Sequence, residues 1–161
     1  MTDSKAAEEA RRRAHELYEG KVTPHRSCGV AIAETFGRPH GAYQSLRRGG
    51  ITGCGECGAL VAGRLVLGEL LGDPSPTGPV TAPLRAAMAA YEPAIRSRFV
   101  TRAGHSAIIC DALTQSFPAF QSPERVAFCT GLAADVAENV ALALEAHGVE
   151  VPVITRDEEP A

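Results

Sequence analysis

The sequence predicts an all-α protein, and three of its features support this fold class. The chain of 161 residues is rich in alanine, contains no tryptophan and has only 5% aromatic residues, which suits close helix packing better than a sheet. Apolar residues recur at spacings of three and four in most segments. Proline and glycine stand where such helices would begin and end. We therefore expect a compact bundle of about five to six helices around a buried central helix at about 53–71.

The first two elements are predicted to be helices joined by a short loop. Residues 3–19 carry one apolar stripe and charged pairs four residues apart, which is typical of an amphipathic helix, and Gly20 ends it. Pro24 follows a threonine, and this pair is a helix start signal, so a second helix is expected over 24–36. That helix would hold Cys28 near its N-terminal end, where backbone N–H groups favour a thiolate.

The most unusual stretch of the chain leads into the predicted central helix. Five glycines and two cysteines fall within the ten residues from Gly49 to Gly58. Glycine permits positive φ angles and lets other groups approach the backbone closely. The segment 53–71 has only Arg64 and Glu69 as charged side chains after its first turn. A helix that is apolar nearly all round is a buried one, so we expect this helix at the centre of the bundle.

Proline and glycine divide the second half of the chain into further helices. One begins at Thr81, and Pro93 is expected to kink it or split it near Tyr91. A short helix is predicted over 106–116 and a long one over 122–147, the latter starting with a serine–proline–glutamate signal. The apolar stripes of these helices predict that each buries one face in the bundle.

Composition limits the class of protein. Residues 1–148 are expected to form one helical domain, and 149–161, with two prolines and several charges, a flexible C-terminal tail. The net charge of −3, with both signs interspersed, does not indicate nucleic-acid binding. No apolar run reaches the roughly 18–20 residues that span a bilayer, and the N-terminus lacks an apolar signal region. We therefore expect a cytoplasmic protein that binds neither nucleic acid nor membrane.

The cysteines are the main functional signal, and there are five: Cys28, Cys54, Cys57, Cys110 and Cys129. In a reducing compartment, clustered cysteines more often bind metal or do redox chemistry than form structural disulfides. Each predicted helix places its cysteine on an inward face. We therefore expect all five sulfur atoms to converge near the start of the central helix. For a single cysteine taken alone, the simpler interpretation is a small buried hydrophobic residue.

The order and rough spacing of these cysteines resemble a redox-active protein family named C_GCAxxG_C_C, on the following residues: Cys28, Gly53-Cys54-Gly55-Glu56-Cys57-Gly58, Cys110 and Cys129. Gly55 stands where the family pattern has alanine, and Cys57 falls on a position that the pattern leaves free. The resemblance covers most of the chain. It implies an all-helical bacterial protein whose cysteines are redox-active or bind a redox cofactor.

An iron–sulfur cluster is the expected cofactor. Thiolates suit such clusters, and the N–H groups of nearby glycines can hydrogen-bond cluster sulfurs. The five cysteines are one more than a [4Fe–4S] cluster needs, so Cys54 and Cys57 would compete or one would be spare. Zinc ranks lower, because a structural zinc site usually draws its ligands from two compact pairs. The protein would transfer electrons with a redox partner protein or act on a small molecule.

Two other functions stay open on the sequence. Cys54 and Cys57 form a CxxC pair at a predicted helix start, which favours thiolates and therefore dithiol–disulfide or sulfur-transfer chemistry without a cofactor. Glu56 lies between them as a candidate acid or base, or more simply as a solvated residue that favours the helix start. Arg64 would balance an anion or pair with a neighbouring helix. The remaining alternative is a structural helical module, whose alanine-rich faces would permit a homodimer.

Overall fold

The computed structural model describes residues 3–154, and every regular element within that range is a helix, as predicted. The elements in order are α1 (Lys5–Glu19), α2 (Cys28–Thr35), the 3₁₀ helix η1 (Gly41–Leu46), α3 (Arg47–Gly50), α4 (Gly58–Leu71), α5 (Ala82–Ala103), α6 (Cys110–Thr114) and α7 (Pro123–Ala146). An isolated antiparallel bridge pairs Glu56 with Ile109. The all-α fold class is therefore confirmed.

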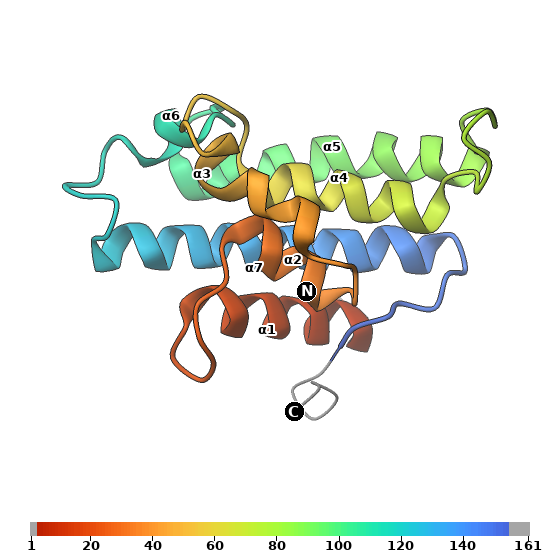
Figure 1. The fold of residues 1–161 in the computed structure, drawn as a ribbon, viewed down its shortest axis with the longest axis horizontal. Coiled ribbons are helices and arrows are strands. Elements are labelled where there is room, and N and C mark those ends of the chain that lie inside the picture. The colour runs from red at the N-terminus through yellow and green to blue at the C-terminus, as the bar shows by residue number, and fades with distance from the viewer. Residues whose placement is uncertain (1–2, 155–161) are drawn as a thin grey trace.

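Helix α7 crosses the middle of the molecule and contacts α1 on one side and α4 and α5 on the other (Figure 1). Its inner positions are alanine, valine and leucine, and most of them are fully buried. By length and composition α7 could cross a membrane, but 61% of its most apolar 18-residue stretch is buried inside the protein. The core helix of a globular protein can be equally long and apolar. Because α7 is long, it contacts α1, α2, α4 and α5 along its length.

Helix α4 is buried as predicted, but it is shorter than the expected range of 53–71. It begins at Gly58, with Cys57 as its N-cap residue. Gly53 has a φ of 82°, which no α-helix contains. The backbone N–H of Cys57 donates to the carbonyl of Ile108 at 2.7 Å, so the residues before α4 pair with a distant segment instead of continuing the helix.

A kink or a split was expected near Tyr91, and the split does not occur, because helix α5 runs without a break through Pro93. Proline removes one N–H and frees the carbonyl of Ala89. Both Pro93 and Ala89 are exposed, so water can bind that carbonyl. The opposite face, which includes the fully buried Ile95, holds the helix against the core.

Two other helices are also shorter than predicted. The predicted helix over 24–36 begins only at Cys28, because the Arg26 N–H donates to the carbonyl of Leu17 at 2.8 Å and keeps that segment extended along α1. The predicted helix over 106–116 shortens to the five residues of α6.

The start of the predicted C-terminal tail is attached to the core. Val149, Val151 and Val153 pack against core residues, and the Ile154 N–H donates to the carbonyl of Thr35 at 2.9 Å. Residues 149–154 of the expected flexible tail therefore contact the helical domain. Residues 155–161 of that tail lie outside the described residues.

Candidate functional site

A cavity of about 120 Å³ lies where the starts of α2, α4 and α6 meet the N-terminal half of α7. Four cysteines from four separate segments line it: Cys28, Cys57, Cys110 and Cys129. All five cysteines of the chain are free thiols. The structure therefore brings together sulfur atoms that are up to a hundred residues apart in the chain.

Three of the four cavity cysteines stand at helix starts. Cys28 is the first residue of α2, Cys57 is the N-cap of α4, and Cys110 is the first residue of α6. Cys129 lies on α7, two turns from its N-terminus. Backbone N–H groups of the first helical turn have no partner within the helix, so they are available to sulfur atoms placed there.

The glycines of the central stretch let these segments approach one another. A Cβ atom at position 58 would lie 2.7 Å from the Sγ of Cys28, so Gly58 allows Cys28 to sit against the start of α4. A Cβ atom at Gly49 would lie 2.5 Å from the Cβ of Cys110. Gly49 also has a φ of 61°, which glycine adopts at little cost.

Backbone hydrogen bonds tie the glycine-rich loop to the segment that carries Cys110. The Cys110 N–H donates to the carbonyl of Gly55 at 2.9 Å, and the Asp111 N–H donates to that of Gly53 at 3.0 Å. Ile51, in the same loop, has a φ of 73°, a strained conformation for a β-branched residue. These contacts fix where the loop delivers Cys57 and Cys110 to the cavity.

Burial raises the pKa of all four cavity thiols. For Cys110, burial together with the charges of Cys28 and Cys129 raises the pKa to about 11. Backbone N–H groups act in the opposite direction: those of Gly29, Ala59 and Arg48 lower the pKa of Cys28. Burial wins, so the thiols keep their protons at neutral pH unless a positive centre such as a metal displaces them.

Positive side chains share the cavity with the thiols. These are Arg47, Arg48 and Arg125, and no aspartate or glutamate of residues 3–154 lines the cavity. Arg125 is only 4% exposed, donates from Nε to the carbonyl of Phe120 and from Nη1 to the hydroxyl of Tyr18. Hydrogen bonds from Arg125 and Tyr18 to the Cys129 thiol favour its thiolate, against the larger effect of burial on its pKa.

Two of the predicted site residues lie outside this cavity. Cys54 is exposed, and its backbone N–H donates to the Oγ1 of Thr52 at 3.2 Å. Glu56 forms an ion pair with Arg64 at 2.9 Å. Because the helix begins only at Gly58, Cys54 and Cys57 do not share a helical face, and the expected convergence of all five sulfurs includes four.

Arg64 has the structural role that the sequence allowed for. Its guanidinium donates to both carboxylate oxygens of Glu92 on α5, in addition to its ion pair with Glu56. Arg102, on α5, pairs with Asp135 instead of lining the cavity. Neither arginine is placed to balance a charge at the four thiols.

The potential donors of the cavity are four thiols and the backbone N–H groups beside them. Within residues 3–154 no three His, Cys, Asp or Glu side chains lie close enough to hold one metal ion. A single zinc needs four ligand atoms at about 2.3 Å from the metal, whereas a [4Fe–4S] cluster presents a separate iron to each of four cysteines. Thiolates and backbone N–H groups are donor types that such a cluster uses.

Sequence reasoning missed three residues that line the cavity beside the thiols, namely Arg125, Tyr18 and Phe120. One signal was available: Arg125 and Cys129 are four residues apart on a predicted helix, so they share a face. No signal in the sequence indicated Phe120, whose ring lies under the guanidinium of Arg125 at 3.9 Å from its centroid. That contact depends on the loop between α6 and α7.

Comparisons of this chain with family models, with curated proteins and with solved structures find no match. The resemblance to the C_GCAxxG_C_C family therefore stays a hypothesis that depends on the cysteine motif alone.

Proposed function

We propose that this chain is a cytoplasmic redox protein in which Cys28, Cys57, Cys110 and Cys129 bind an iron–sulfur cluster. The observation that carries the proposal is that these four thiols line one cavity. When bound, a cluster supplies one-electron transfer at a buried centre. The electron would be exchanged with a redox partner protein or a small molecule at the mouth of the cavity.

The chain's own residues have distinct roles in this proposal. The four thiolates hold the cluster, and N–H groups at the starts of α2 and α4 hydrogen-bond the ligand sulfurs and stabilise their charge. Leu113, Leu132 and Phe120 line the cavity with apolar surface that limits water around the centre. The glycines at 49 and 58 let the four segments reach it.

The alternative that uses Cys54 and Cys57 as a dithiol pair has less support. One of these thiols is exposed and the other is buried in the cavity. Burial raises the pKa of Cys57 well above its usual value, which opposes its use as an attacking thiolate. A zinc site has less support as well, since a structural zinc site usually draws its ligands from two compact pairs and this chain has one, Cys54 and Cys57.

The test is anaerobic purification followed by iron and sulfide analysis and an absorption spectrum. We expect a brown protein with about four iron atoms per chain, the content of one [4Fe–4S] cluster. The matched pair of variants is Cys57→Ala and Cys54→Ala. Cys57→Ala should lose most of the iron, because it removes a cavity thiol, while Cys54→Ala should keep it.

Three results would contradict the proposal. Wild-type protein that stays colourless and iron-free after anaerobic reconstitution has no cluster function. Equal iron loss in the two variants would mean that the cavity thiols are not the ligands. Stoichiometric zinc in place of iron would make the site structural rather than redox-active.

A further inference from the structure

Arg125 is a buried cation whose neighbours are neutral. It is 4% exposed and lines the cavity. Its hydrogen bonds go to the carbonyl oxygen of Phe120, to the hydroxyl of Tyr18 and to the thiol of Cys129. Among residues 3–154 no carboxylate forms an ion pair with it. A buried charge without a counter-charge is costly, so a site that retains one is arranged around an anion.

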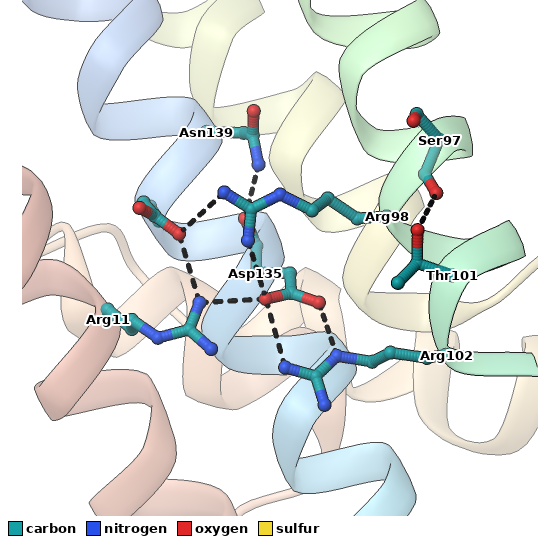
Figure 2. A network of polar contacts seen from close by, with 8 residues as sticks. Arg11, Ser97, Arg98, Thr101, Arg102, Asp135 and Asn139 are labelled. Carbon is teal, nitrogen blue, oxygen red and sulfur yellow. Dashed lines mark hydrogen bonds and ion pairs between the residues drawn. The ribbon is translucent and has the colours of Figure 1, made fainter. Parts of the chain in front are cut away.

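The chain compensates buried charge in the usual way elsewhere. Asp135, only 1% exposed on α7, accepts hydrogen bonds from Arg11, Arg98 and Arg102, and two of these arginines also pair with Glu138 (Figure 2). Those guanidinium groups come from α1 and α5 and meet carboxylates in the middle of the bundle. Arg125, two to three turns earlier on the same helix, has no such partner.

The rest of the cavity adds to the imbalance. Arg47 and Arg48 line it too, and no carboxylate from the described part of the chain does, although the whole sequence carries a net charge of −3. Arg48 lies 4.0 Å from Asp111, outside the lining, while Arg47 makes no ion pair in the described part of the chain. The charge that this cavity lacks is therefore negative, and a neutral or cationic occupant would leave Arg125 uncompensated.

We propose that Arg125 is the fixed counter-ion of a net-negative occupant of the cavity, held in place by Tyr18 and by the carbonyl and ring of Phe120. This inference deepens the proposed function, in which the occupant is the cluster with its four thiolates. A cation against Cys129 stabilises the more negative, reduced state of such a centre over the oxidised state. Arg125 thus sets the potential at which the centre accepts an electron.

The first experiment compares the reduction potential of the loaded wild type with that of Arg125→Met, Arg125→Lys and Arg102→Met. Arg125→Met should make one-electron reduction at least tenfold less favourable, a drop of about 59 mV for a one-electron couple. Arg125→Lys keeps the charge and should recover most of the shift. Arg102→Met is the control, because it removes an arginine that pairs with Asp135 and does not line the cavity, and it should leave the potential unchanged.

Iron content and circular dichroism of each variant show whether fold and loading are retained, and Arg125→Lys covers the case in which Arg125→Met fails to fold. If Arg125→Met has the same reduction potential as the wild type, or if Arg125→Lys shifts it as much as Arg125→Met does, the inference is overturned. The proposal that the protein binds a cluster would be unaffected.

A second experiment separates the inference from the proposed function. If the wild type takes up no cluster, the metal-free protein is titrated with sulfate by calorimetry. Binding that falls at least tenfold in Arg125→Met, and not in Arg102→Met, would support an anion site of another kind. Absence of sulfate binding by a protein that also holds no cluster would overturn both ideas.

Discussion

Replacing Gly58 by alanine should displace Cys28 from the cavity and destabilise the protein. The added Cβ would lie 2.7 Å from the Cys28 Sγ and even closer to the carbonyl oxygen of Leu46. The second neighbour is backbone, so it cannot move aside as a flexible side chain does. Overpacking of this kind costs about 1–3 kcal/mol, and the better helix propensity of alanine returns at most about 1 kcal/mol. A net loss of about 1–2 kcal/mol is expected.

The assay is urea unfolding of the metal-free protein, followed by iron analysis after reconstitution. Gly58→Ala should lower the unfolding midpoint and the iron content together, because the same clash moves a core contact and a proposed ligand. The matched control is Gly68→Ala on the same helix, where an added Cβ meets no atom within 4 Å. That control should gain about 0.5–1 kcal/mol. Equal stability and equal iron in the two variants would refute the packing argument.

Two further predictions concern Asp135 and Cys54. Burial disfavours the charged form of Asp135, but hydrogen bonds from Arg102 and Arg11 outweigh it and hold the carboxyl pKa below its usual value. The ionised carboxylate therefore stabilises the fold. This stability is present above the unfolded-state pKa of about 4 and is lost as the pH falls through the folded-state pKa. Urea midpoints at pH 6 and pH 3 should thus differ by less in Asp135→Asn than in the wild type, and an unchanged pH dependence would count against this ion network. Cys54 is the exposed thiol, so an alkylating reagent at pH 8 should modify it in the native metal-free protein well before the four cavity thiols. Peptide mass mapping identifies the modified residue, and a cavity thiol modified first would contradict the assigned burial.

Much of the fold could be predicted from local pattern. Alanine-rich stripes at helical spacing, threonine and serine caps and terminal glycines identified α1, α5 and α7 to within a few residues. The errors fall where a distant segment competes with the helix. Residues 53–57 follow the hydrogen bond from Cys57 to Ile108, and the segment before α2 follows that from Arg26 to Leu17. A single segment's propensity contains no information about such partners.

The candidate site shows the same division more sharply. Local pattern singled out all five cysteines and the glycines among them, but not which of the CxxC thiols faces the others. The position at which α4 begins decides this. Cys57 is the N-cap of α4 and lines the cavity, while Cys54 is exposed in the loop before the helix. Arg125 escaped notice because an arginine in an amphipathic helix is ordinarily solvated, and only packing against Phe120 and Tyr18 buries it.

The sequence by itself determined that this chain forms helices, where most of them end, and which residues are candidates for its chemistry, because these depend on residue types and on side chains a few positions apart. Only the tertiary structure decided that four sulfurs from four segments line one cavity, that the fifth stays outside, and that a buried arginine with no carboxylate partner among residues 3–154 lies beside them. The physical reason is that cavity lining and charge compensation depend on contacts between residues far apart in the chain, which close helix packing through glycine and alanine creates.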